Sequence, residues 1–152
     1  MNRLHPRIRL IWIFRTVIIA MVFGALGTGG YLFFDLPVVL GGAAFSFVLI
    51  IGLPMAFLRY RRWRYEIRED ALYLERGVIT EVRTVVPFVR IQHVDSRRTP
   101  LERATGLAST VVYTAGSRGA DVRIPGLSPS NAQDLRERLK RLAIASEGED
   151  AV

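Results

Sequence analysis

Two long stretches without a charged side chain, residues 16–34 and 36–58, constrain the fold of this chain more than any other feature. They contain 19 and 23 residues and are separated only by Asp35. About 20 helical residues, each rising 1.5 Å, cross a hydrocarbon core roughly 30 Å thick. Buried helices of soluble proteins seldom lack a polar face over this length. The sequence therefore predicts a transmembrane hairpin over residues 16–58, with helices at about 16–34 and 37–58 and a tight turn after Asp35.

A cleaved signal peptide is the main alternative for the first apolar stretch. The residues before it are basic, as they are in a signal peptide. Arg15 interrupts the apolar region, however, and no small-residue cleavage site of the Ala-x-Ala kind follows. These features favour a membrane helix that stays in the mature protein.

Small residues recur four positions apart in both apolar stretches. Ala20, Gly24 and Thr28 fall on one face of the first predicted helix, and Gly42 and Ser46 share a face of the second. Small residues at this spacing allow helix backbones to approach closely in a membrane. We expect them to pack the two helices of the hairpin together, in preference to forming a dimer seam.

Charge is concentrated around the apolar block. The formal net charge is +7, and basic chains of 152 residues often bind nucleic acid. Residues 1–15 and 59–64 each carry four arginines and no acid, however, whereas residues 65–152 have a net charge of zero. The excess charge therefore indicates membrane topology, and we expect no nucleic-acid partner.

The positive-inside rule relates these arginines to orientation. Both flanks of the predicted hairpin are basic and its turn carries an acid, which predicts that the N-terminus and residues 59–152 face the cytoplasm. The chain is then a multi-pass protein of the cell (inner or plasma) membrane with both termini cytoplasmic. The lipid bilayer is its first expected partner.

Aromatic and basic residues at the predicted cytoplasmic ends of the helices form a candidate membrane interface. Aromatic rings favour the headgroup layer, and juxtamembrane arginines gain about 1 kcal/mol each from an anionic leaflet. Arg15 lies about one turn inside the apolar region and is expected to extend its guanidinium outward. These residues either set the topology alone or also bind lipid headgroups. The candidate membrane-interface residues are Trp12, Arg15, Arg59, Arg61, Arg62, Trp63 and Arg64.

From Trp63 onward the apolar residues recur with a period of two, which is typical of half-buried strands. Thr99-Pro100-Leu101-Glu102 is a capping box that predicts a short helix, and Ser128-Pro129 opens a longer amphipathic helix that ends at about Ala145. A seventh strand is expected at a strand break or within residues 96–108. The six predicted strands cover residues 63–68, 71–76, 78–86, 89–95, 109–115 and 120–124.

These elements define an α+β organisation with four segments. Residues 1–15 are predicted to form a basic cytoplasmic N-terminus and residues 16–58 the membrane hairpin. Residues 59–145 form a cytoplasmic domain of antiparallel strands with a C-terminal helix. Residues 146–152 form a flexible acidic tail.

Motifs that support catalysis or metal binding are missing from the sequence. The chain has no cysteine, and His5 and His93 are not at metal-ligand spacing. Phosphate-binding glycine loops, nucleophile elbows and zinc-protease motifs are also missing. We therefore expect a protein that is not an enzyme and binds no cofactor or metal. His93 is expected on the Val89, Ile91 and Asp95 face of its strand as an ordinary packed or edge side chain.

Arginines between residues 90 and 103 suggest a second candidate site. Arginine binds phosphate or carboxylate through two parallel hydrogen bonds, so a cluster of arginines beside turns is typical of an anion-binding patch. The favoured alternative is a solvated rim in which these arginines pair with Asp95 and Glu102. The candidate patch consists of Arg90, Gln92, Arg97, Arg98 and Arg103.

Several segments occur in an order that resembles a known family. Together with the two preceding apolar helices, they resemble the bacterial pleckstrin-homology-like (PH-like) membrane proteins of the YdbS/YdbT type, over essentially the whole chain. Glu102 stands where that family often has glutamine. The segments are Trp63-Arg64-Tyr65, Val89-Arg90-Ile91-Gln92-His93-Val94, Pro100-Leu101-Glu102-Arg103, Gly106-Leu107-Ala108, Thr114-Ala115-Gly116 and Ile124-Pro125-Gly126-Leu127.

The resemblance implies a curved, seven-stranded antiparallel barrel of two sheets, capped by a C-terminal helix. It also implies binding without catalysis. The expected function is a membrane-anchored binding or scaffolding module in an envelope-associated protein complex, with a related PH-like membrane protein or a second copy as partner. The alternative is a module that senses anionic lipid at the cytoplasmic face, with Arg61, Arg62 and Arg64 touching headgroups.

Overall fold

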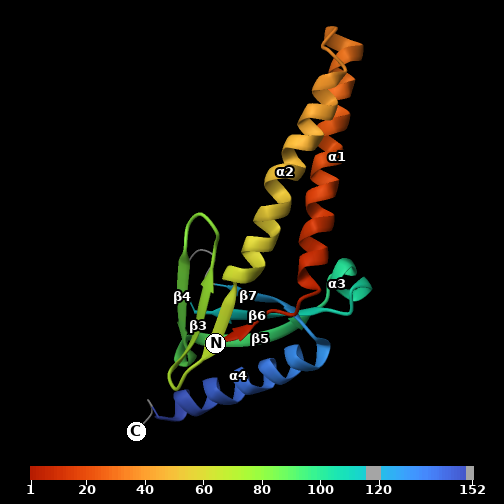
Figure 1. Ribbon diagram of the computed structural model, residues 1–152. Coiled ribbons are helices and arrows are strands. Elements are labelled where there is room, and N and C mark those ends of the chain that lie inside the picture. The colour runs from red at the N-terminus through yellow and green to blue at the C-terminus, as the bar shows by residue number, and fades with distance from the viewer. Residues whose placement is uncertain (116–120, 150–152) are drawn as a thin grey trace. The chain divides into compact units, whose positions relative to one another are not determined.

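The computed structural model describes residues 1–115 and 121–149, which divide into two compact units (Figure 1). One unit is the helical hairpin, Arg9–Arg61. The other combines Met1–Ile8 with the chain from Arg62 onward. The globular domain is therefore discontinuous in sequence, and the hairpin is inserted into it.

The hairpin consists of helix α1 (Ile8–Phe34) and helix α2 (Val39–Arg62). Each contains an apolar span of 24 residues, long enough to cross a membrane, and only 11 % of each span is buried inside the protein. A core helix of a soluble protein would bury most of its apolar surface, so this exposure indicates helices that face lipid. Both helices extend beyond the predicted apolar stretches into the arginine-rich flanks. Between them, Asp35 adopts φ +51°, a left-handed conformation that Asp tolerates better than most residues.

Small residues form the contact between α1 and α2. The contact face of α1 is the predicted one, whereas that of α2 differs from the prediction. A β-carbon added to Gly27 would lie 2.8 Å from the Gly41 Cα, and one added to Gly41 would lie 2.8 Å from the Gly24 carbonyl oxygen. Ala20 is fully buried in the same contact. The prediction for Gly42 and Ser46 was wrong, because both face outward and Gly41 occupies the contact face.

The described residues of the domain form two antiparallel sheets and two further α-helices. The sheets are joined by a short 3-10 helix at Phe88–Arg90, which follows Pro87 at the end of β4. This architecture confirms the predicted apolar hairpin joined to an α+β domain of two antiparallel sheets with a C-terminal helix, but in the described residues the two sheets stay separate and do not pair into a closed barrel. The first sheet has the order β1 (Asn2–Arg3), β2 (Arg64–Ile67), β3 (Ala71–Arg76), β4 (Val82–Pro87); the second has β5 (Ile91–Arg97), β6 (Ala108–Thr114), β7 (Val122–Leu127); the helices are α3 (Pro100–Ala104) and α4 (Pro129–Glu149).

The seventh strand, β1, lies ahead of the hairpin and not where the sequence suggested. Asn2 and Arg3 pair with β2, and the His5 amide donates a 2.7 Å hydrogen bond to the Gly126 carbonyl. Leu4 and Ile8 are each 2 % exposed, in the domain core. The predicted basic N-terminal segment, residues 1–15, is thus divided between the domain and α1.

Helix α4 covers the sheets and closes the core (Figure 1). Ala132, Leu135 and Leu139 are buried on one face of this amphipathic helix, and the Thr110 hydroxyl of β6 donates to the Ala132 carbonyl at 3.1 Å. The helix continues to Glu149, so residues 146–149 of the predicted acidic tail are helical. The rest of that tail, residues 150–152, lies outside the described residues, as does residue 120 of the last predicted strand.

Candidate functional site

Arginine side chains contact aromatic rings at one end of the hairpin, where α1 begins and α2 ends. The Arg59 guanidinium carbon lies 4.8 Å from the Trp12 ring centroid, and that of Arg9 lies 4.9 Å from the Tyr60 ring. Cation–π contacts of this kind contribute about 0.5–1 kcal/mol at exposed sites. Two of the predicted interface residues, Trp12 and Arg59, are therefore in direct contact. Arg9 was not among the residues predicted from the sequence, because its ring partner, Tyr60, lies 51 residues away.

The other predicted interface residues divide between the two units. Arg15 and Arg61 are exposed on the hairpin, and Arg61 lies 5.9 Å from the Phe57 ring centroid. Arg62 and Arg64 belong to the domain unit. Trp63 is a correction: it is 3 % exposed and packs edge-to-face on Tyr65, so its ring belongs to the domain core and not to a membrane interface.

The predicted arginine patch does not converge in space. Arg90 precedes β5 and Arg98 follows it, and eight residues of extended chain separate their Cα atoms by about 26 Å. Arg97 donates to the Tyr113 hydroxyl, and Arg98 donates to the Leu107 carbonyl at 3.1 Å. Arg103 lies on α3. These side chains are divided between the two ends of the strand, which argues against a single anion site.

Glu102 forms a structural network and does not pair with that patch. It is 3 % exposed and accepts hydrogen bonds from the Thr99 amide and hydroxyl, which completes the predicted capping box. Its carboxylate also pairs with Arg123 of β7 at 3.0 Å, and Arg123 further donates to the Ser109 hydroxyl at 3.1 Å. This network ties α3 to the second sheet. The expectation that Glu102 pairs with the neighbouring arginines was therefore wrong.

His93 lies on the opposite face from the one its alternation pattern predicts. A bulge between Ile91 and His93 shifts the register against β6, so Ile91 is buried and His93 is exposed. The imidazole stacks on the Tyr113 ring, with centroids 4.1 Å apart and an angle of 16° between the planes. A period-two pattern cannot reveal a bulge, which adds one residue to a strand.

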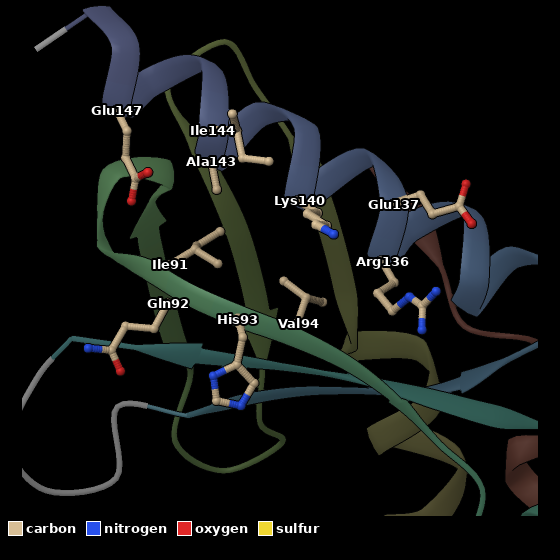
Figure 2. Close-up of a pocket in the computed structure, with 10 residues that line it drawn as sticks. All are labelled: Ile91, Gln92, His93, Val94, Arg136, Glu137, Lys140, Ala143, Ile144 and Glu147. Atoms are coloured by element: carbon tan, nitrogen blue, oxygen red, sulfur yellow. The ribbon is translucent and has the colours of Figure 1, made fainter. Parts of the chain in front are cut away.

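A groove lies between β5 and α4 (Figure 2). Its volume is about 540 Å³, within the usual range for binding pockets. On the β5 side it is lined by Ile91, Gln92, His93 and Val94, and Figure 2 shows the side chains of Ile91 and Val94 directed toward α4 and those of Gln92 and His93 directed away from α4. The residues of α4 that line it are Arg136, Glu137, Lys140, Ala143, Ile144 and Glu147.

The sequence reading identified one member of this groove, Gln92, as a site residue and missed the others. The groove joins residues 91–94 to residues 136–147, and no local pattern relates segments so far apart. The exposed Ile144 was the available signal, because it interrupts the polar face of an otherwise amphipathic helix and is 60 % exposed.

A second hollow of about 420 Å³ lies between the first sheet and α4. It is mostly polar and is lined by Asn2 and Arg3 of β1, Tyr65 of β2 and Asp134 of α4, among others. Burial raises the pKa of Tyr65, and a side-chain hydrogen bond from Asn2 lowers it in part. Across the described ranges, 1–115 and 121–149, no group of three His, Asp or Glu side chains is arranged to hold a metal ion.

Comparison with known proteins places this architecture in a family. Residues 15–143, most of the chain, match the bacterial PH domain family. The chain belongs to this family. It is also similar to the transmembrane protein YdbS of Bacillus subtilis strain 168, with 29 % identity over 150 residues that cover 93 % of this chain and 92 % of YdbS. No solved structure matches it.

Membership of the bacterial PH domain family agrees with the two sheets, the C-terminal helix and the apolar hairpin, and confirms the resemblance found in the sequence. The protein is a membrane protein that carries a PH-like module. The family match begins at residue 15 and therefore does not include β1, the strand that precedes the hairpin.

Proposed function

We propose that the PH-like domain is a protein-binding module held at the cytoplasmic face of the cell membrane, where it joins this chain to an envelope-associated membrane complex. The partner is a related PH-like membrane protein or a second copy of this chain. The observation that carries the proposal is the groove between β5 and α4, which places apolar side chains beside the edge of a sheet. Such edges commonly pair with other chains.

The sidedness of the domain is supported by two observations. Arginines flank both ends of the hairpin, and positive flanks favour the cytoplasm. β1 and β2 flank the hairpin in the sequence and pair with each other. Because paired strands lie in one compartment, the hairpin must enter and leave a membrane on the same side, as two spans require.

Cross-linking in native membranes tests the proposed function. The wild-type chain should form a cross-linked species that contains a second polypeptide, and Ile144→Asp should reduce its yield at least fivefold because it places a charge in the groove. Ile79→Asp is the matched control, since Ile79 is 88 % exposed outside the groove. Recovery of the single chain alone, or equal losses in both variants, contradicts the proposal.

Anionic-lipid sensing is the second candidate function. It is favoured by the exposed Arg61 and Arg62 and by the cation–π contacts at the base of the hairpin. The test uses the full chain, because a fragment that begins after the hairpin lacks β1. In nanodiscs of mixed zwitterionic and anionic lipid, the double variant Arg61→Gln/Arg62→Gln should retain fewer anionic lipids by native mass spectrometry. Arg138→Gln/Arg141→Gln is the control, and equal retention in both variants removes this candidate.

A further inference from the structure

The outer edge of β5 is available for another strand. The second sheet has the order β5-β6-β7, so β5 pairs with β6 along one edge. Within the described part of the chain, residues 92–97 pair with β6 alone, and the Ile91 amide donates to the Phe88 carbonyl of the 3-10 helix that precedes the strand. The groove is lined by β5 and α4 and by no residue of β6. It therefore borders the unpaired edge of the strand.

The floor of the groove suits apolar side chains. Ile91 and Ala143 are 5 % and 7 % exposed and form its base, whereas Ile144 is 60 % exposed at its margin. Figure 2 shows Val94 and Ile91 turned toward α4 across the opening. An extended segment bound along β5 would direct every second side chain into this floor.

Charges along α4 differ between the two ends of the groove. Arg136, Glu137 and Lys140 lie toward the Val94 end, where two basic groups face one acid, and Glu147 lies toward the Ile91 end (Figure 2). In the part of the chain that the structure describes, none of these four charged groups forms an ion pair. Arg136 and Glu147 are eleven residues apart on the helix, or about 16 Å, which corresponds to about five residues of extended chain.

We propose that this groove binds an extended peptide segment of a partner protein, which adds to the sheet as a strand antiparallel to β5. The proposal rests on the proposed protein-binding function and names the chemistry of the partner. α4 runs antiparallel to β5 (Figure 1), so the added strand runs in the same direction as α4. Its acidic residue meets Arg136 and Lys140 near its amino end, and its basic residue meets Glu147 about five positions later. Apolar side chains between them fill the floor.

Two synthetic nine-residue peptides of identical composition test this proposal. Both alternate valine and threonine; the first has aspartate in its amino-terminal third and lysine in its carboxyl-terminal third, and the second exchanges these two residues. Binding to the full chain in nanodiscs is measured by fluorescence anisotropy. The first peptide should bind about tenfold more tightly, because two ion pairs are replaced by two like-charge contacts in the second.

Charge reversal on the protein provides the matched test. The triple variant Arg136→Glu/Lys140→Glu/Glu147→Lys should invert the preference between the two peptides. Hydrogen exchange should show slower exchange of β5 amides, within residues 91–97, when the first peptide is bound. Equal affinity for both peptides, an unchanged preference in the triple variant, or unchanged β5 exchange overturns the proposal.

The same measurements separate this proposal from its alternatives and from the proposed function. If the chain is dimeric in nanodiscs and its β5 amides are protected without peptide, the occupant is a second copy and the peptide proposal fails. If native membranes yield the cross-linked complex while neither peptide binds, the protein-binding function stands and strand addition is wrong. If the peptides bind as expected while native membranes yield the single chain alone, peptide binding in the groove is supported and the proposed membrane complex is wrong.

Discussion

The hairpin and the domain place their large apolar side chains in opposite ways. In the hairpin, Phe33 and Ile50 are 82 % and 72 % exposed, and the helices touch through glycine, alanine and threonine. In the domain, Leu72, Ile124 and Leu139 are fully buried. The contrast follows from the solvent around each unit. Lipid is itself apolar, so large apolar side chains gain nothing from being buried between the helices, and close packing of the backbones holds the helices together.

The two units also differ in how they treat charge. The described part of the hairpin keeps its charged groups at its ends, apart from Arg15, whereas the domain buries Glu102 and pairs it with Arg123. A buried ion pair is costly to break, because the remaining charge loses its partner. Breaking this buried pair should therefore destabilise the domain, and disturbing close backbone packing should destabilise the hairpin. Four substitutions test this difference, from the largest expected effect to the smallest.

Glu102→Ala should destabilise the domain by about 3 kcal/mol, because it removes the capping-box carboxylate that accepts from the Thr99 amide and leaves Arg123 without its carboxylate partner. The measurement is the free energy of unfolding of the detergent-solubilised protein in denaturant. Glu69→Ala, at an exposed position of the β2–β3 turn, should cost less than 0.5 kcal/mol, as is usual for surface changes. Similar losses in the two variants would mean that the buried network contributes little.

Gly126→Ala should destabilise the domain by about 2 kcal/mol. Gly126 has φ +65°, and its added β-carbon would lie 2.8 Å from the Ile8 β-carbon. Gly148→Ala provides the control: no atom lies within 4 Å of its added β-carbon, so the change should be neutral or stabilising in a helix. Thermal unfolding measures both, and an unaffected Gly126→Ala would show that the N-terminal segment does not pack against β7.

Gly41→Ala should destabilise the hairpin by about 1.5 kcal/mol, because its added β-carbon would lie 2.8 Å from both the Gly24 carbonyl oxygen and the Thr28 nitrogen. The neighbouring Gly42→Ala faces open space and should not destabilise it. Helical circular dichroism during heating in detergent distinguishes the two. An equal response at positions 41 and 42 would contradict the contact face described above.

Tyr65→Phe should change the free energy of unfolding least of the four substitutions, and its pH-dependent effect should appear only at alkaline pH. Burial raises the pKa of Tyr65 in the folded domain above the ordinary value of 10.0. The stabilising contribution is therefore complete below pH 10 and is lost as the pH rises through the raised folded value. Unfolding measured against pH should show a smaller decline above pH 10 in the variant than in the wild type. Parallel curves would mean that Tyr65 titrates normally.

Local rules predicted much of this structure. The apolar stretches predicted the hairpin to within several residues, and the Thr99–Glu102 capping box predicted α3, because both signals lie within one segment of chain. β1 escaped prediction since two polar residues, Asn2 and Arg3, become a strand only by pairing with β2 more than 60 residues later. The exposed position of His93 escaped for a related reason, because its bulge is set by the register with β6.

The candidate site was predicted less well than the fold. Arginines that are close in sequence, from Arg90 to Arg103, suggested a patch, but an extended strand carries its ends far apart. The groove is formed by the packing of α4 beside β5. Neither segment shows a sequence pattern that indicates this packing. The sequence showed where the charged residues lie along the chain, whereas the groove between β5 and α4 depends on tertiary structure.

The insertion of the hairpin between β1 and β2 has a consequence for biosynthesis. A ribosome releases β1 first, yet its partner strand emerges only after both apolar helices have been made. In the proposed two-span topology, the first sheet is completed only when the second helix has returned the chain to the side of the membrane on which β1 lies. A chain whose hairpin stalls or inserts in a single pass keeps Leu4 and Ile8 unburied, and correct membrane insertion becomes a precondition for a finished domain.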